Sequence, residues 1–292
     1  MQGWRLGQLA NAHGLASLDL DSAGFVATRA YGGFPWSIDA YMDLAEAFPF
    51  RRVASLDYCT EHEIAGDREE VLDRVSRTIR ANRDCLAQAA TRGLLDRFMP
   101  VIQGRRREDY ERCVDALWPV MVPGAVIGVG SMCRREIAGP EGVVAIFEHL
   151  DRILPSTVRL HGFGVKGSAL PYLTPLAPRI ASIDSQAFGG SARREALRRG
   201  ISKTDALVAD HLERWLCVQH ARLREPAAPL RRTEADAAPA ASNDPWEIAI
   251  AAARSEIRAQ IEDGDLEHDE ITAGWIEQWA AEIYHRQCRR AA

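Results

Sequence analysis

A short apolar run followed by an amphipathic helical stretch recurs along the first two thirds of the chain, and this alternation constrains the fold most. The stretches between the runs, such as 68–93, 108–120 and 141–155, have helical periodicity and good helix formers. Strands that alternate with helices predict a parallel sheet, because parallel neighbours need a crossover connection. The six predicted strand regions are 15–25, 52–61, 97–104, 125–135, 157–170 and 179–190.

A closed barrel and an open doubly wound sheet both contain such a sheet. An open dinucleotide-binding sheet carries GxGxxG after its first strand, and the sequence has no such motif. Every predicted strand instead ends in its own polar or glycine cluster, as in a barrel that builds its site from several strand ends. We therefore expect an α/β fold of the TIM (β/α)8 type. Only six strands are evident, so we expect either an incomplete first unit at the N-terminus or closure through residues 190–224.

Composition changes after residue 224 and predicts three regions. Residues 225–245 are rich in Ala and Pro and lack apolar periodicity, as linkers do. Residues 246–292 carry Ile and Trp at helical spacing on both sides of a polar break, which predicts a helical hairpin appendage. Residues 1–224 are then the barrel-like catalytic domain.

Charge is spread unevenly along the chain. The total of −5 would argue against a nucleic-acid partner, but eleven acidic and five basic residues from Asn243 onward give that part −6 and leave about +1 for the rest. No run approaches the roughly 20 apolar residues of a membrane helix, and the N-terminus lacks a signal-peptide layout. The six cysteines are scattered, as reduced thiols are. We expect a cytoplasmic protein with no membrane partner.

Three predicted strands end in an acidic residue: Asp21, Asp57 and Asp184. A single Asp in this position is usually a helix N-cap or turn residue. Three at one barrel mouth would repel each other, so one is expected to retain its proton, which suits a nucleophile paired with a general acid/base. Glycosyl transfer needs paired carboxylates because its transition state at C1′ resembles an oxocarbenium ion. Glycines beside these acids fit either tight turns or the close approach of a planar base.

Six short motifs close the predicted strands: DSAGF (21–25), DYCT (57–60), VIQG (101–104), GVGS (128–131), GFGVK (162–166) and SIDS (182–185). Each motif alone is a weak signal, but the ordered set is specific. Over about residues 15–200 it resembles the tRNA-guanine transglycosylase superfamily. GVGSMCRR and the pair HGFGVKG and SIDS are most similar to the DpdA-like branch, named for deazapurine modification of DNA.

The resemblance implies a glycosyltransferase (pentosyltransferase) that replaces guanine in a polynucleotide, with DNA favoured, by a 7-deazaguanine such as preQ0. Asp184 matches the nucleophile that forms a covalent glycosyl intermediate, and Asp21 matches the general acid/base. The implied base-binding residues are Asp57, Gln103, Gly104, Gly130 and Gly164.

Basic residues follow several strand ends and predict a positive rim that contacts the phosphates of DNA or tRNA. The alternative is that they are solvated helix starts, and for Lys166 a salt bridge to an aspartate. The rim residues are Arg105, Arg106, Arg134, Arg135, Lys166, Arg193 and Arg194.

The tRNA enzymes of the superfamily hold a structural zinc with a CxCxxC cluster and a distal His, and this spacing is absent here. His211, Cys217 and His220 are the nearest candidates, but their helical context favours core and surface positions. We expect no metal and no cofactor.

Three alternatives stay open. The same exchange could act on tRNA, as in queuosine or archaeosine synthesis. A catalytically degraded barrel could instead bind nucleic acid or other proteins of a DNA-modification system. A glycoside or nucleoside hydrolase shares the carboxylate chemistry.

Overall fold

The computed structural model describes residues 14–61, 64–225, 244–262 and 273–291. The chain divides into two compact units. Unit 1 comprises Met1–Val165 and Pro175–Asp184, and unit 2 comprises Lys166–Thr174 and Ser185–Ala292. Residues 226–243, most of the predicted linker, lie outside the described residues, so the predicted domain boundaries stay predictions. Within the described part of the chain, no helix combines the length and apolar character needed to cross a membrane.

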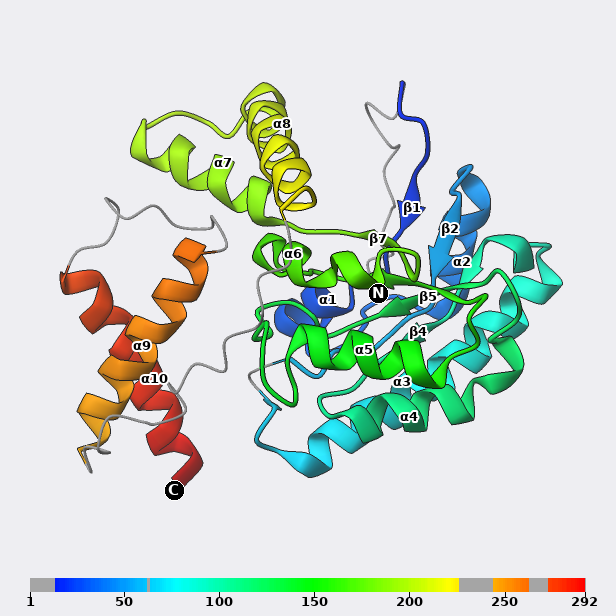
Figure 1. The fold of residues 1–292 in the computed structure, drawn as a ribbon, viewed down its shortest axis with the longest axis horizontal. Helices are drawn as coiled ribbons and strands as arrows, with labels where there is room; N and C mark the ends of the chain where they lie inside the picture. The colour runs from blue at the N-terminus through cyan, green and yellow to red at the C-terminus, as the bar shows by residue number, and fades with distance from the viewer. Residues whose placement is uncertain (1–13, 62–63, 226–243, 263–272, 292) are drawn as a thin grey trace. The chain divides into compact units, whose positions relative to one another are not determined.

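Unit 1 is built on parallel strands, and each of the six predicted strand regions contains one, which confirms that prediction. The hydrogen-bonded order is β1-β2-β3 in one sheet and β4-β5-β6-β7 in the other; Figure 1 labels β1, β2, β4, β5 and β7 among these strands. The strands are β1 (Asp19–Leu20), β2 (Arg52–Ala54), β3 (Phe98–Met99), β4 (Val101–Ile102), β5 (Val126–Val129), β6 (Arg159–Gly162) and β7 (Ile180–Ile183).

The two sheets meet at Pro100, which separates β3 from β4. The carbonyl of Pro100 accepts the backbone N–H of Gly128 at 2.8 Å, while β3 pairs with β2. Asn82 of the neighbouring helix donates to the carbonyl of Val101 and accepts its N–H, both at 2.9 Å. The buried amide of Asn82 therefore makes the two backbone hydrogen bonds that a neighbouring strand would make with Val101. It thereby fixes the backbone just before Gln103.

Within each sheet every strand pairs with the next one along the chain, and the described strands show no reversal of order. An open doubly wound sheet reverses its order at a switch point. The sequential parallel order is the order that a (β/α)8 barrel contains. Closure into a complete barrel stays a prediction.

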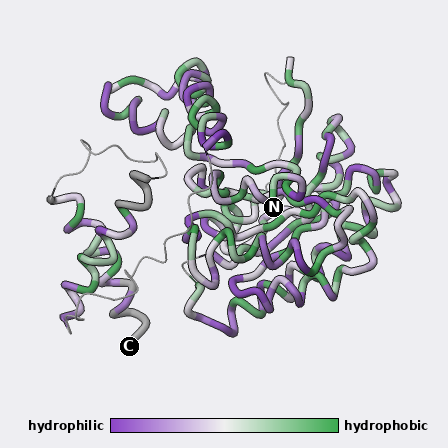
Figure 2. Tube along the Cα trace, in the orientation of Figure 1, coloured by the Kyte–Doolittle hydropathy of each residue, from purple (hydrophilic) through white to green (hydrophobic). Residues whose placement is uncertain are grey.

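The helices of unit 1 bury one face each and leave the other in water. In α3, residues at helical spacing, among them Val71, Val75 and Ile79, are buried, and the side chain of Asp67 caps the helix by accepting the N–H of Glu70 at 3.1 Å. Figure 2 shows the resulting alternation of hydrophobic and hydrophilic residues along these helices. They are α1 (Gly24–Tyr31), α2 (Ile38–Ala47), α3 (Arg68–Thr91), α4 (Arg107–Ala116) and α5 (Val143–Ile153), with 3-10 turns at Leu95–Arg97 and Trp118–Val120.

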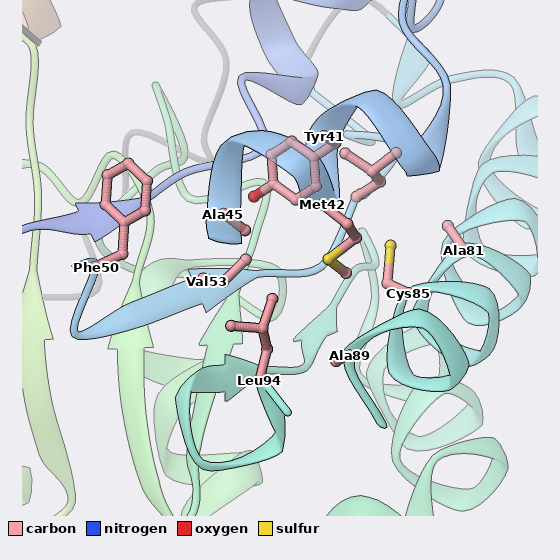
Figure 3. Packing of buried hydrophobic residues seen from close by; sticks show 10 residues of the cluster. Tyr41, Met42, Ala45, Phe50, Val53, Ala81, Cys85, Ala89 and Leu94 are labelled. Carbon is pink, nitrogen blue, oxygen red and sulfur yellow. The ribbon is translucent and has the colours of Figure 1, made fainter. Parts of the chain in front are cut away.

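Buried hydrophobic residues of α2, α3 and β2 pack together in one cluster (Figure 3). The hydroxyl of Tyr41 donates to the carbonyl of Ala54 at 2.7 Å, so the end of β2 is tied to α2 just before Asp57. The buried members are Tyr41, Met42, Ala45, Phe50, Val53, Leu56, Ala81, Cys85, Ala89 and Leu94.

Unit 2 is helical. In α7 and α8, Glu195 meets His211 at 2.8 Å across the helix pair. The helices α9 and α10 pack through small and aliphatic residues such as Ala253 and Ala280, so the helical C-terminal region is present. The elements are η4 (Gly167–Ala169), α6 (Leu170–Leu173), α7 (Ala187–Arg198), α8 (Asp205–Arg222), α9 (Pro245–Glu262) and α10 (Ala273–Ala291), with the 3-10 turn Thr174–Leu176 at the boundary of the units.

Candidate active site

Asp21 and Asp184 follow β1 and β7, the two outermost strands of the pairing order, and both are exposed. Crowding by surrounding protein atoms raises the pKa of Asp21, and the negative charge of Asp184 raises it further. In a flat sheet these strand ends would lie about 24 Å apart at roughly 4.8 Å per strand spacing, well beyond the screening length of about 10 Å in ordinary salt. A flat arrangement of the strands therefore does not account for the influence of Asp184 on Asp21.

The loop after β6 orients the carboxyl of Asp184. The backbone N–H of Gly164 donates to Oδ1 of Asp184 at 2.5 Å, and Asp184 donates its own N–H to the carbonyl of Gly162 at 3.2 Å. Gly164 has φ of +68°, a conformation that glycine adopts without strain. Crowding raises the pKa of Asp184, whereas the hydrogen bond from Gly164 lowers it. The predicted base-binding residue Gly164 thus acts here as a support for the predicted nucleophile.

His161 of β6 is a site residue that the motif analysis did not single out. It is buried, and its Nδ1 lies 2.8 Å from Oγ of Ser182 on β7. Burial lowers the pKa of His161 to about 4, although the charges of Asp19 and Asp21 act in the opposite direction. At neutral pH the ring is therefore uncharged, and it supplies no counter-charge to the carboxyls.

A buried polar network joins the loops after β1, β2, β4 and β5. Asp57 accepts hydrogen bonds from the hydroxyl of Ser22 and the amide of Gln103. The hydroxyl of Ser131 donates to Oε1 of Gln103 at 2.5 Å and accepts the backbone N–H of Thr60 at 2.7 Å. The motif analysis missed three residues of this network: Ser22, Thr60 and Ser131. Each of them lies in the same motif as a predicted site residue.

Asp57 occupies the centre of this network. Burial raises its pKa to about 6, the charge of Asp21 adds to the rise, and the hydrogen bonds from Ser22 and Gln103 lower it. Asp57 and Gln103 expose only 7% and 1% of their surface. The structure thus brings together the two polar side chains predicted to read the base, but a base would reach Gln103 only after the network rearranges.

Three strand-end glycines are required by packing. A Cβ on Gly130 would lie 2.0 Å from Nε2 of Gln103, and one on Gly104 would lie 2.6 Å from Cβ of Asp109. A Cβ on Gly24 would lie 2.5 Å from the carbonyl oxygen of Asp57. Close packing is therefore sufficient to explain these glycines, and base contact by Gly104 and Gly130 stays a prediction.

The prediction that Arg135 belongs to a solvent-facing rim is wrong. Its side chain is 0% exposed, and its guanidinium donates to backbone carbonyls, among them those of Gly104 and Ser131. A side chain without accessible surface does not meet a polynucleotide. Its neighbour Arg134 is exposed, so the two consecutive arginines differ completely in environment.

Only part of the predicted rim in unit 1 is open to a phosphate. Arg105 is 14% exposed at its side chain and pairs with Glu141 at 2.7 Å. Arg106 is 56% exposed and shares Glu141 at 3.5 Å. The guanidinium of Arg134 lies over the ring of Phe25, 5.6 Å from its centroid. Arg106, Arg134 and the partly exposed Phe25 are thus the accessible groups of this set.

The remaining predicted rim residues lie in unit 2. Arg193 is exposed, Arg194 is half-buried and lies 3.4 Å from Oγ of Ser191, and Lys166 is half-buried. Their contribution to a nucleic-acid surface stays a prediction.

The candidate zinc ligands do not converge among the described residues, where no group of three or more His, Cys, Asp or Glu side chains could hold a metal. His211 bonds Glu195, while Cys217 and His220 are exposed on α8. The expectation that the protein needs no cofactor stays a prediction.

The two exposed carboxyls offer complementary chemistry. Because the charge of Asp184 raises the pKa of Asp21, ionisation of both carboxyls at once is disfavoured. One carboxyl is then available as a proton donor and the other as an anion, which is the division that glycosyl transfer requires.

Comparison with known protein families gives a match over most of the chain. The family model described as DpdA, DeoxyPurine in DNA protein A, matches residues 5–245, well over half of the chain. A search of curated proteins finds no match.

Proposed function

Since this chain belongs to the DpdA family, we propose that it exchanges guanine in DNA for a 7-deazaguanine such as preQ0. The family has a role in deazapurine modification of DNA and is part of the transglycosylase superfamily, so a glycosyltransferase-type enzyme is its general class. The specific proposal rests on the carboxyls of Asp21 and Asp184, which follow the first and last described strands. The N–H of Gly164 orients Asp184, and the charge of Asp184 raises the pKa of Asp21.

In the first half of the proposed reaction, Asp184 attacks C1′ of the target nucleotide. A carboxylate oxygen forms a bond to C1′ while the bond from C1′ to N9 of guanine breaks, and the electron pair of that bond goes to the base. Asp21 donates the proton that makes guanine a neutral leaving group. The target nucleotide leaves the base stack to reach these residues, as with other enzymes that act on bases.

In the second half, the incoming 7-deazaguanine gives its N9 proton to Asp21. N9 then attacks C1′, the bond to Asp184 breaks, and the carboxylate is regenerated. Two inversions at C1′ retain the configuration, and the free base leaves before the new one enters, so ping-pong kinetics are expected.

The strands support a closed barrel for this chemistry. The strands follow one another in sequential parallel order, and β3 and β4 share one position on either side of Pro100. The charge of Asp184, after β7, raises the pKa of Asp21, after β1. We therefore propose a fold of the (β/α)8 type, with the accessible Arg106 and Arg134 as candidate phosphate contacts.

A labelled-base experiment tests the function. The full chain is incubated with radiolabelled guanine or preQ0 and with DNA, bulk tRNA or a guanine mononucleoside, and the products are digested to nucleosides and identified by mass spectrometry. Label in DNA is the expected result. Label only in tRNA would shift the assignment to tRNA, and free base released from the mononucleoside would indicate a hydrolase. No label and no covalent complex would indicate a catalytically degraded barrel.

Asp57 is expected to make base binding pH-dependent. With a pKa of about 6, its carboxyl is mostly protonated at pH 5 and mostly ionised at pH 7. Only the ionised form accepts both N–H donors on the edge of a guanine-like base while keeping its own hydrogen bonds. KM for the base should therefore fall about tenfold as pH rises from 5 to 7, and Asp57→Asn should flatten this profile at a high KM.

Asp19→Asn is the matched control. Burial acts to raise the pKa of Asp19, but its hydrogen bond and ion pair with Arg51 hold that pKa below the usual value, so this carboxyl stays ionised from pH 5 to 7. The control should keep the inflection near pH 6. The same inflection persisting in Asp57→Asn would show that Asp57 does not contact the base.

A further inference from the structure

Arg135 binds four backbone carbonyls in the interior of unit 1. Its Nε donates to Ser131 at 2.8 Å, one terminal nitrogen to Arg105 at 2.8 Å and Glu141 at 2.7 Å, and the other to Gly104 at 2.8 Å. Removing a guanidinium from water is costly unless its donors are satisfied, and here the carbonyl dipoles satisfy them.

The four carbonyls belong to two loops. Gly104 and Arg105 lie in the loop after β4, and Ser131 and Glu141 lie in the loop between β5 and α5. Arg135 thereby ties together the two loops whose side chains Gln103 and Ser131 hydrogen-bond to each other at 2.5 Å.

Tyr110 of α4 completes this arrangement. Its hydroxyl lies 3.1 Å from a terminal nitrogen of Arg135 and donates to the carbonyl of Gly130 at 2.8 Å. Gly130 in turn packs directly against the side chain of Gln103. A shift of Arg135 would therefore be transmitted to Gln103 along two routes, through Gly104 and through Tyr110.

A second buried arginine at the other end of the strands also binds backbone carbonyls, and in addition it forms an ion pair with Asp151 at 2.9 Å. Arg179 precedes β7 and donates to the carbonyls of Pro155, Val158 and Leu154 at 2.5, 2.7 and 2.7 Å. It also donates to the carbonyl of Asp151 at 3.1 Å. The candidate catalytic groups follow the carboxyl ends of the strands, whereas Arg179 precedes β7. Arg179 therefore stabilises backbone carbonyls as Arg135 does, but at the opposite end of the strands from the site.

We propose that Arg135 is a positioning residue that fixes the Gln103–Ser131 pair and thereby sets the affinity of the site for the incoming base. The proposal rests on the proposed base exchange. A lysine in its place has three donors on a single nitrogen and lacks the planar fork, so it cannot hold all four carbonyls at once.

The test compares Arg135→Lys with Arg179→Lys in the full chain. Both variants should lower the melting temperature, since each loses several buried hydrogen bonds. Only Arg135→Lys should raise KM for preQ0, by about ten- to a hundredfold, with a smaller change in kcat, because displaced contact groups weaken binding of the base. Arg179→Lys should leave KM within about twofold.

Tyr110→Phe is the milder second variant, since it retains the ring and removes only the hydroxyl that joins Arg135 to Gly130. It should raise KM as well, with a smaller loss of stability than Arg135→Lys because it removes two hydrogen bonds and not four or more. Equal KM effects of Arg135→Lys and Arg179→Lys, or an unchanged KM in both Arg135→Lys and Tyr110→Phe, would overturn the proposal.

Amide hydrogen exchange gives a readout that is independent of activity. In Arg135→Lys, peptides covering 103–106 and 130–135 should lose protection, whereas Arg179→Lys should affect 155–160 and 176–181. Wild-type protein that incorporates no base would refute the proposed function alone. Unchanged protection of 103–106 and 130–135 in Arg135→Lys would refute the positioning role whether or not exchange occurs.

Discussion

Asp184→Asn should lower base exchange on the order of 10⁴-fold or more and abolish the covalent complex with DNA, because an amide does not replace the carboxylate nucleophile. The substitution keeps the size of the side chain and an oxygen that accepts the hydrogen bond from Gly164, so the fold should be retained. Exchange is measured with labelled base, and the complex is measured as a protein–DNA band that resists denaturation.

Asp96→Asn provides the control, because Asp96 is an exposed carboxyl in the 3-10 turn before β3. It should exchange bases at the wild-type rate. Substantial exchange by Asp184→Asn, with thermal unfolding unchanged in both variants, would mean that another group attacks C1′.

Asp21→Asn should lower exchange about 10²- to 10⁴-fold, the contribution of a positioned general acid/base. The effect should depend on the leaving base. Guanine needs a proton to leave, whereas 7-methylguanine already carries a positive charge and leaves as a neutral base. With 7-methylguanine in the DNA, Asp21→Asn should therefore form the covalent complex at nearly the wild-type rate.

Asp184→Asn is the matched comparison for this substrate, since a better leaving group does not restore a missing nucleophile. It should form no complex with either base. If 7-methylguanine rescued Asp184→Asn and not Asp21→Asn, the two roles would be reversed. If it rescued neither, Asp21 would act on something other than the proton of the leaving base.

The strand regions were predictable because they depend on local sequence. Apolar runs ending in polar clusters, separated by helical stretches, identified all six regions in which the structure has parallel strands. The interruption at Pro100 had a visible signal, since proline lacks the N–H that a central strand position needs. Its repair by Asn82 had none, because the amide lies on a distant helix and pairs with Val101 only in the folded chain.

The sequence predicted which residue types lie at the site, but not how buried they are or which partners they bind. Asp21, Asp57, Gln103 and Asp184 follow strands as expected. The sequence did not show that Asp57 and Gln103 are buried against each other, nor that Gly164 holds Asp184. Motif positions specify which side chains are present near a strand end, whereas burial and partners depend on how the loops pack.

Arg134 and Arg135 show the same difference at adjacent positions. Both follow β5 and carry the same charge, and the sequence assigned both to the rim. Arg134 has φ of +53° and its guanidinium stacks on Phe25, while that of Arg135 enters the interior. The turn geometry that separates them comes from contacts with the loops after β4 and before α5, which local sequence does not describe.

The sequence by itself determined the order of strands and helices, the acids at the strand ends and the likeness to a transglycosylase, because periodicity and motifs act over short distances along the chain. Only the tertiary structure decided which charges interact. The charge of Asp184 acts on Asp21, although the two residues follow the last and the first of the described strands. Packing of the loops between them decides which arginine meets solvent and which holds the backbone, since burying a charge requires partners that only the folded chain supplies.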